Sequence, residues 1–497
     1  MNDNLNATPL LRPEMRSLLK LATPIIGTMV TRMAMGFVDF VMVSRLGTDA
    51  TAAVSPATIL VFAVMCLGMG GATSVQTFAA QALGRRQPRE AAAYAWQTLY
   101  LAIVFALFCY PLTRLAGPLW ALIAAAPEVQ ALQVAYCRIA FWSMGFAIIT
   151  FGLEGFFNGI QKPSVSLIAA LVALVFNAAA NYCLIFGHFG FPALGIRGAA
   201  YATVIAWGVR ALLLSMVFLS REIRHTFGTL LTWRFSREKI KGMFYVGGPT
   251  AIQWVLDIGA WFVFLSLLMK DFGTAAMAAA NIVLQYMHFA FMPALGIGIA
   301  LNSLVGHAIG EGRPNVAVVR TRACMIVTGT YMGLVGLVFL IARYPLMRLM
   351  SADPQTLISD PAVVSLGAGI LIWAAIFQVF DAASITYMSA LRGAGDTRWP
   401  AAVILLDCWL VFIGGGYLVS RLAPQWGVHG PWMMCTLYII LYGLALSWRF
   451  RRGAWRKIDL FKTSSAAAPV AVEKCAEATG LLPIPAAGAE AADKVDR

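Results

Sequence analysis

Long apolar stretches, separated by short polar segments, run along almost the whole chain. A helix that crosses a membrane needs about 20 mostly apolar residues, and stretches of that length recur with polar, Gly or Pro residues between them. Twelve are found, at residues 15–44, 51–80, 92–118, 130–156, 163–188, 192–220, 243–270, 278–306, 319–347, 361–391, 399–420 and 426–450. The pattern predicts an all-α membrane protein with twelve transmembrane helices.

The second half of the chain repeats the first. The polar segment 221–241 divides the predicted helices six and six, and the run from Arg45 to Ala53 recurs from Asp271 to Ala279. Three matched pairs are each 226 residues apart, namely Gly47 with Gly273, Gly84 with Gly310, and Pro88 with Pro314. Because six is even, both halves enter the membrane from the same side. The sequence therefore predicts two homologous six-helix bundles related by a pseudo-two-fold axis along the membrane normal.

The composition agrees with a membrane-embedded chain, and the distribution of basic residues predicts which side of the membrane each loop faces. Of the 497 residues 60% are hydrophobic and 12% charged, whereas soluble domains are about 25% charged. The net charge of +14 invites a nucleic-acid partner, but the basic residues lie in short loops between apolar stretches. In the predicted topology, 24 of the 37 Lys and Arg lie on the side of the termini and seven on the other side. Basic loops are typical of the cytoplasmic face, so both termini are expected there.

The expected organisation follows from these two patterns. It comprises a cytoplasmic N-terminus (1–14), an N-terminal lobe (15–220), a basic cytoplasmic linker (221–242), a C-terminal lobe (243–450) and a basic, then disordered tail (451–497). The polar start of the chain lacks a small-residue cleavage site after its first apolar run, so a cleaved signal peptide is not expected. No ATP-binding or hydrolase motif such as GxxxxGK or GxSxG appears, and no cofactor is expected.

Five acidic residues fall inside the predicted spans: Asp39, Glu154, Asp257, Asp381 and Asp407. An ionised carboxylate in lipid costs several kcal/mol, so such residues face a cavity, pair with a cation, or bind a proton or ion. Amides lie one helical turn from several acids: Gln253 precedes Asp257 and Gln378 precedes Asp381. Asn177 and Asn181 share one helix face because they are four residues apart.

The residues around the first acid resemble a known family. The run from Gly36 to Gly47, which contains Asp39, and the Lys-Pro, Asn-x-x-x-Asn and Pro-Ala-Leu-Gly-x-x-Gly-Ala-Ala motifs from Lys162 to Ala200 are similar to the multidrug and toxic compound extrusion (MATE) transporters. The resemblance covers about residues 15–450, and it is greatest with the bacterial NorM-like drug exporters. It implies an antiporter of the bacterial inner membrane that exports cationic, amphipathic compounds in exchange for Na⁺ or H⁺.

The resemblance also implies sites in both halves. In the N-terminal half the matching cation site consists of Asp39, Asn177, Asn181 and Thr203, whose oxygen atoms suit Na⁺. In the C-terminal half the acidic pair matches Asp257 and Asp381, although the first of these positions is usually Glu in the exporters. A proton would need only the carboxylates, so the coupling ion stays open between Na⁺ and H⁺.

A drug cavity with aromatic, thioether and amide groups is expected near these acids, because flat cations bind aromatic faces and adaptable Met side chains. The candidates are Met33, Phe37, Gln253, Trp254, Gln285, Tyr286, Met287 and Gln378. The expected partners are small cationic amphipathic molecules and membrane lipids, with no nucleic acid, and the protein is expected to act as a monomer.

Two acids and one rival function stay open. Glu154 lies near the end of its span, where we expect it to reach the interface or to pair with Lys162, and for Asp407 we expect a hydrogen bond between helices. The rival function is a flippase for lipids or lipid-linked sugars. Such a protein would line its cavity with Arg and Lys, whereas only Arg32, Arg138 and Arg210 lie inside the spans. An acidic cavity favours cationic cargo.

Overall fold

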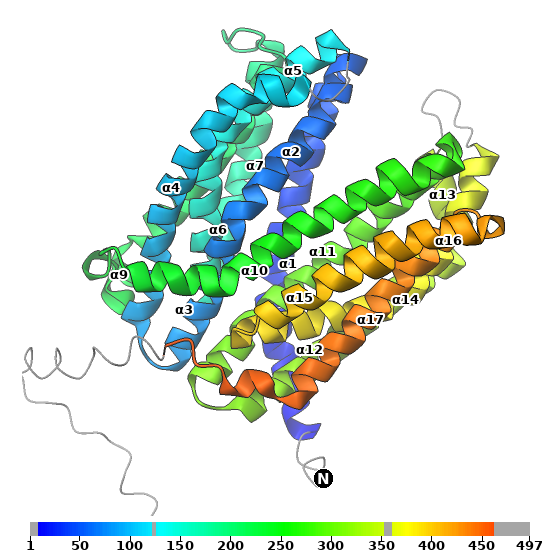
Figure 1. Cartoon of the computed structure of the whole chain (residues 1–497). Helices are drawn as coiled ribbons and strands as arrows, with labels where there is room; N and C mark the ends of the chain where they lie inside the picture. The colour runs from blue at the N-terminus through cyan, green and yellow to red at the C-terminus, as the bar shows by residue number, and fades with distance from the viewer. Residues whose placement is uncertain (1–7, 122–125, 352–359, 462–497) are drawn as a thin grey trace, which may run out of the picture. The chain divides into compact units, whose positions relative to one another are not determined.

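The protein is an all-helical bundle over the residues that the structure, a computed structural model, describes: 8–121, 126–351 and 360–461. Among these residues, those up to Ile458 form one compact unit, to which residues 459–461 do not belong. The predicted disordered tail therefore lies almost wholly outside the described residues. Figure 1 shows the helices in chain order.

The described chain contains twelve helical spans long and apolar enough to cross a membrane, as the sequence predicts. The helices of the first six spans are α1 (Thr8–Ser44), α2 (Thr48–Thr73), α3 (Val75–Gly84), α4 (Pro88–Ala121), α5 (Pro127–Ala140), α6 (Met144–Gly159), α7 (Pro163–Phe186) and α8 (Ile196–Phe218). The short α9 (Arg221–Phe227) follows, and the last six spans contain α10 (Arg237–Val263), α11 (Thr274–Gly310), α12 (Pro314–Ile341), α14 (Pro361–Ala394), α15 (Arg398–Asp407), α16 (Gly416–Leu422) and α17 (His429–Arg452). A further helix, α13 (Arg343–Ser351), lies between α12 and α14.

Two spans contain π-helical segments. The seventh continues from α10 through Phe264–Leu268, and the eleventh passes from α15 to α16 through Cys408–Gly415. A π-helical turn leaves some backbone groups out of the regular α-helical ladder and often occurs at functional sites in helices. Both segments lie in the C-terminal half, which we call the C-lobe (the last six spans); the first six spans are the N-lobe.

Backbone conformations repeat between the two lobes, which supports the internal duplication. Gly47 and Gly273 precede α2 and α11 with φ of 114° and 89°. Gly195 and Gly427 precede the last span of each lobe with φ of 56° and 52°. At two further matched positions the N-lobe has a side chain where the C-lobe has Gly: Arg86 (φ 57°) matches Gly312 (73°), and Gln161 (62°) matches Gly395 (86°). The loops therefore kept their backbone path while their residues diverged.

The two lobes contact each other through α3 of the N-lobe, which packs against α11. The Gln76 amide donates to the Ile299 carbonyl at 2.7 Å and to the Ser303 hydroxyl at 2.9 Å. The Gln81 amide donates to the Gly393 carbonyl at 2.9 Å. These side chains are buried, so the hydrogen bonds satisfy polar groups that would otherwise lie unpaired between the lobes.

Glycines let the lobes approach closely along this interface. A Cβ at Gly247 of α10 would lie 2.1 Å from the Gly70 carbonyl of α2, and a Cβ at Gly70 would lie 2.4 Å from the Ala251 Cβ. A Cβ at Gly84 would lie 2.2 Å from the His307 carbonyl. Small residues at helix crossings allow backbone contact in membrane proteins, where packing rather than water exclusion holds helices together.

Helix α1 contacts both lobes. Its first part packs in the apolar core of the C-lobe, where Leu18, Ala22 and Ile25 are buried, and Glu14 pairs with Arg320 of α12 at 3.0 Å. Further along, α1 packs against α7 of the N-lobe. One continuous helix therefore belongs to two packing environments, and a movement between the lobes must bend or slide α1.

The linker between the lobes is fastened to α4. The Trp96 indole donates to the Thr229 carbonyl at 2.6 Å, and Gln97 donates to the Arg234 carbonyl and accepts from the Ser236 amide. In α9, a hydrogen bond from Lys162 and its positive charge lower the pKa of Glu222. Because the pair is exposed to solvent, we expect it to add little to stability.

The glycine contacts predict a stability difference between two adjacent positions. In Gly247→Ala the new methyl group must displace backbone, so we expect a destabilisation of about 1–3 kcal/mol, as for other overpacked sites. Gly248→Ala is the matched control, because a Cβ there meets nothing within 4 Å. Thermal unfolding of the two variants in detergent measures the difference. Equal melting temperatures for Gly247→Ala, Gly248→Ala and the unmodified protein would show that the lobes are not held by this contact.

Candidate functional site

The four predicted residues of the N-lobe site lie together. Asn181 of α7 donates from its amide nitrogen to Asp39 Oδ1 of α1 and, at 3.2 Å, to Asn177 Oδ1. The Thr203 hydroxyl of α8 lies 3.4 Å from Asp39 Oδ2. Both asparagines are fully buried. Helix α1 and the consecutive helices α7 and α8 therefore bring one carboxylate, two amides and a hydroxyl to one place.

This cluster contains polar atoms that are not satisfied within the described residues. Asn181 Oδ1 and Asn177 Nδ2 are buried and have no hydrogen-bond partner there. Buried polar atoms normally have partners, and an unpaired one costs about 1–3 kcal/mol. Rotation of the Asn181 amide would turn its oxygen towards Asp39. The cluster can then present several oxygen ligands to a small cation.

Sequence reasoning missed a tyrosine at this cluster. Tyr136 of α5 is buried and interacts electrostatically with Asp39. No signal in the chain distinguishes Tyr136 from other aromatic residues in apolar spans. Only the packing of α5 against α2 and α8 brings it to the acid.

The C-lobe acids also approach one another. Asp257 of α10 and Asp381 of α14 are close enough for their charges to interact. Tyr438 of α17 interacts with both, and sequence reasoning did not identify it. One turn before the acids, Gln253 Oε1 and Gln378 Oε1 are buried without a hydrogen-bond partner among the described residues. Each glutamine lies on the same helix face as its acid, one turn away.

The expected hydrogen bond of Asp407 is not found. Its Oδ2 is buried and unpartnered in the part of the chain that the structure describes. Asp407 lies at the junction of α15 with the π-helical segment Cys408–Gly415, and its charge acts on Cys408 and Tyr442. Asp257 also acts on both of these residues. A third carboxylate thus lies near the C-lobe pair.

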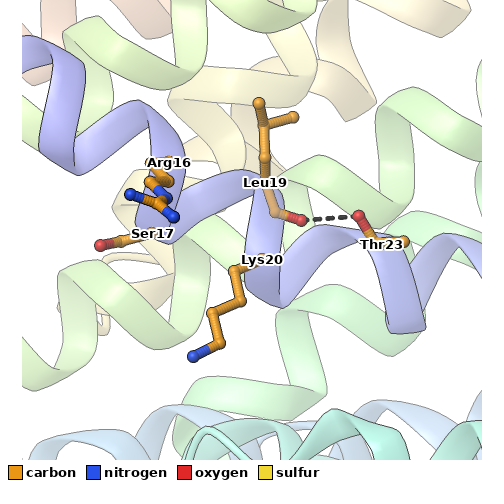
Figure 2. A pocket seen from close by; sticks show the side chains of 5 residues that line it. All are labelled: Arg16, Ser17, Leu19, Lys20 and Thr23. Carbon is orange, nitrogen blue, oxygen red and sulfur yellow. Dashed lines mark hydrogen bonds between the residues drawn. The ribbon is translucent and has the colours of Figure 1, made fainter.

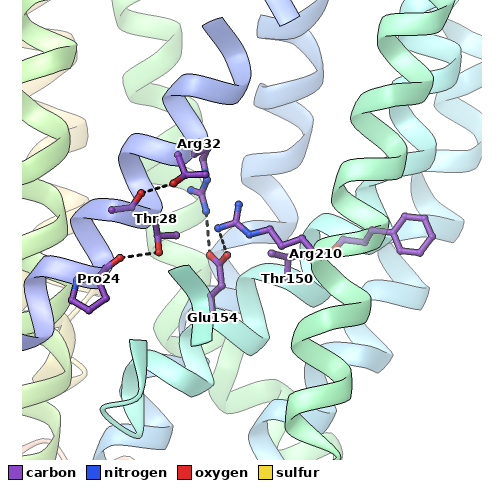
Figure 3. A network of polar contacts seen from close by, with 9 residues as sticks. Pro24, Thr28, Arg32, Thr150, Glu154 and Arg210 are labelled. Carbon is purple, nitrogen blue, oxygen red and sulfur yellow. Dashed lines mark hydrogen bonds and ion pairs between the residues drawn. The ribbon is translucent and has the colours of Figure 1, made fainter. Parts of the chain in front are cut away.

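The expected pairing of Glu154 with Lys162 is wrong. Glu154 of α6 pairs with Arg32 of α1 at 3.1 Å and, through its other oxygen, with Arg210 of α8 (Figure 3). Lys162 instead pairs with Glu222. Glu154 is 5% and Arg210 is 4% exposed, so these groups pair inside the lobe rather than at its end. The spacing along one chain segment cannot reveal partners on helices 122 and 56 residues away.

The other cavity candidates divide by exposure. Phe37 is 68% exposed and Gln285 is exposed, so a substrate could contact both side chains. Met33 and Trp254 are half-buried. Tyr286 and Met287 pack against the C-lobe core, and the Tyr286 hydroxyl donates to the Leu346 carbonyl at 2.7 Å. This hydrogen bond indicates that Tyr286 stabilises the packing of the C-lobe.

Two open hollows occur elsewhere on the protein. One of about 580 Å³ lies along the start of α1, beside Arg16, Ser17, Leu19, Lys20 and Thr23 (Figure 2). Another, of about 640 Å³, lies between α5 and α8, with Arg138, Arg197 and Tyr201 among its lining residues. Neither is lined by Asp39, Asp257 or Asp381. Over the described ranges no group of three or more His, Cys, Asp and Glu could hold a metal ion, so any Na⁺ site depends on amide and hydroxyl oxygens as well.

Known proteins resemble this chain over most of its length. The MatE family pattern matches residues 24–183 and 249–418. A protein of Rhizobium meliloti named "Probable multidrug resistance protein NorM" is 31% identical over 440 residues, 88% of this chain and 93% of the relative. A protein of the same name from Synechocystis is 30% identical over 466 residues, 90% of this chain and 97% of the relative.

Solved structures show the same fold. One is described as a multidrug resistance MATE family transporter of the MOP superfamily in its outward-facing conformation; it is 19% identical, with a TM-score of 0.80, covering 92% of this chain and all of that one. Another, described as MATE in the bent conformation, has a TM-score of 0.81 at 18% identity and covers 91% of this chain and 98% of that one.

The buried network predicts that Glu154→Gln destabilises the protein. The change leaves Arg210 charged, buried and without a counter-charge, which costs about 3–5 kcal/mol in comparable buried pairs. Glu222→Gln is the control, since it removes an acid from an ion pair at the exposed surface, and its melting temperature should stay within error of the unmodified protein. A Glu154→Gln protein that unfolds at the unmodified temperature in detergent would show that solvent reaches both arginines.

Proposed function

Because the chain belongs to the MatE family, whose members are secondary transporters rather than enzymes, we propose that it exchanges Na⁺ or H⁺ for amphipathic, mostly cationic drugs. The family, the NorM relatives and the twelve helical spans make the protein a multi-pass multidrug efflux transporter. Our proposal adds the identity of the coupling ion and the class of the substrates. The observation that carries it is the occurrence of partly buried acids, with amide side chains beside them, inside the spans of both lobes.

The N-lobe cluster suits the coupling ion. Asp39 supplies the charge, and the Asn177, Asn181 and Thr203 oxygens supply neutral ligands of the kind that hard cations prefer. In the structure the Asn181 amide nitrogen faces the acid, so binding of Na⁺ requires the amide to rotate. Binding of a proton requires no rotation, because protonated Asp39 can donate to a neighbouring oxygen. The cluster thus has a different hydrogen-bond pattern for each ion.

The C-lobe cluster suits a cationic substrate or a second coupling ion. Asp257 and Asp381 lie close enough to repel when both are ionised, so the pair favours binding of a positive charge. The buried Gln253 and Gln378 oxygens can accept hydrogen bonds from an ammonium group. Loading of a proton or Na⁺ and binding of a cationic drug then compete for the same negative charge. This competition is the basis of exchange.

Contacts between the lobes support alternating access. The α3–α11 contacts lie at the end of the bundle where the basic loops 85–89 and 311–313 begin. If these loops are cytoplasmic, as the positive-inside rule indicates, the described arrangement is closed towards the cytoplasm. The proposed location is the bacterial inner membrane, with both termini cytoplasmic and one chain as the working unit.

The alternative of a flippase for lipid-linked sugars is less well supported. Two of the three arginines inside the spans, Arg32 and Arg210, share Glu154. They therefore offer one net positive charge, whereas a pyrophosphate carries at least two negative charges. The acids of both lobes, by contrast, favour positive cargo.

Neutralising the clusters should impair export. In cells that carry Asp39→Asn, Asp257→Asn or Asp381→Asn, we expect efflux of a fluorescent organic cation to fall about tenfold or more, the factor for losing ~1.4 kcal/mol of binding. Asp271→Asn is the control, since the Asp271 side chain is 62% exposed at the end of the seventh span, 4.0 Å from Arg421. Each variant's amount in the membrane is measured alongside. Unimpaired export by all three acid variants would contradict the proposal.

A further inference from the structure

The Arg32–Glu154–Arg210 network has more positive than negative charge. Glu154 pairs with Arg32 through one oxygen and with Arg210 through the other (Figure 3). The charged groups that act on Arg210 are Glu154 and Arg32. Two guanidinium groups and one carboxylate leave a net charge of +1 inside an apolar lobe. Such a charge is costly unless another negative group balances it.

The two arginines differ in exposure. The Arg210 side chain is 5% and the Glu154 side chain 7% exposed, whereas the Arg32 side chain is 33% exposed. Arg210 is thus enclosed, and its Nε is buried without a hydrogen-bond partner in the described chain. Arg32 packs over the Phe151 ring at 4.9 Å, and its Nε is likewise buried without a hydrogen-bond partner among the described residues, but its side chain as a whole is 33% exposed. The unbalanced charge is therefore available at Arg32.

Arg32 lies on the same face of α1 as the acid of the N-lobe site. Arg32 and Asp39 are seven residues apart, which is two helical turns or about 10.5 Å along the axis. Arg210 and Thr203 of α8 are also seven residues apart. Polar side chains therefore occur at two heights along α1 and α8. Asp39 and Thr203 lie at one height, where the charge is negative, and Arg32 and Arg210 lie two turns away, where it is positive.

We propose that Arg32 determines specificity by binding the carboxylate of zwitterionic substrates, whose positive end competes with the coupling ion for Asp39. This inference rests on the proposed export function and extends it to a class of substrate. A planar guanidinium donates two parallel hydrogen bonds to one carboxylate, and the partly exposed Arg32 retains donors for them. A bound carboxylate would bring the network to neutrality, with two cations and two anions.

A purely structural ion pair would need only one of the arginines. Glu154 with Arg210 alone would be neutral and enclosed. Arg32 adds the charge that has no counterpart and the only partly exposed side chain of the three. The Phe151 ring packs against the Arg32 guanidinium, with the ring centroid 4.9 Å from Arg32 Cζ. The planar guanidinium favours recognition of a flat carboxylate over that of a spherical anion.

A matched pair of dyes tests the proposal. The probes are a zwitterionic rhodamine with a free carboxylate and the methyl ester of the same dye, which is only cationic. Purified full-length protein is reconstituted into vesicles, and uptake of each dye is measured under imposed Na⁺ and pH gradients. The variants are Arg32→Gln, Arg32→Lys and, as a control arginine within an N-lobe span but outside the network, Arg138→Gln.

We expect Arg32→Gln to lower uptake of the zwitterion about tenfold relative to the ester, the factor for one lost charged contact. Arg32→Lys should give an intermediate ratio, because it keeps the charge but loses the planar pair of donors. Arg138→Gln should leave the ratio of the unmodified protein. Uptake of the ester shows that each variant folds and transports.

Three outcomes would overturn the inference while leaving the export function intact. They are an unchanged ratio in Arg32→Gln, an equal loss of both dyes, and uptake of the ester but not the zwitterion by the unmodified protein. An equal loss would identify Arg32 as a structural ion-pair partner only. Uptake of neither dye by the unmodified protein under either gradient would instead contradict the proposed function.

Discussion

The cost of a polar or charged group in hydrocarbon shapes this protein more than any other constraint. It explains why the described chain is helical throughout, since each helix satisfies its own backbone. It also explains how the few polar side chains inside the spans are arranged. Glu154 serves two arginines, Gln76 and Gln81 bond backbone across the lobe interface, and Asp39 lies among two amides and a hydroxyl. Unsatisfied atoms that lie beside the acids, as at Asn181 and Gln378, are the ones from which we infer ligand-binding regions.

The duplication makes the two lobes alike in backbone but not in chemistry. Matched loops share positive φ angles, and matched glycines begin α2 and α11. The N-lobe, however, has one acid with amides at its site and a separate arginine network, whereas the C-lobe has two close acids and Asp407 nearby. The π-helical segments Phe264–Leu268 and Cys408–Gly415 occur in the C-lobe. Because of this asymmetry, we infer that the two lobes differ in how they bind the coupling ion and the substrate.

Much of the fold and part of the site could be predicted from the sequence. The twelve spans are confirmed because the length and hydropathy of a span can be read directly along the sequence. Matched positive φ angles in the two halves support the predicted repeat. The grouping of Asp39 with Asn177, Asn181 and Thr203 needed the family resemblance, since spacing places only the two asparagines on one face. The partners of Glu154 and the positions of Tyr136 and Tyr438 depend on how separate helices pack. No local pattern encodes that packing, so the expected Lys162 pair was wrong and the tyrosines were missed.

The central claim is that carboxylates within the lobes couple an ion gradient to drug export. The most direct measurement is uptake of a fluorescent organic cation into proteoliposomes, with a Na⁺ gradient or a pH gradient imposed separately, for the unmodified protein and for Asp39→Asn. The account predicts concentrative uptake under at least one of the two gradients, none without a gradient, and loss of the gradient-driven uptake in Asp39→Asn. Uptake by the unmodified protein that is independent of both gradients, or gradient-driven uptake that Asp39→Asn leaves intact, would contradict it.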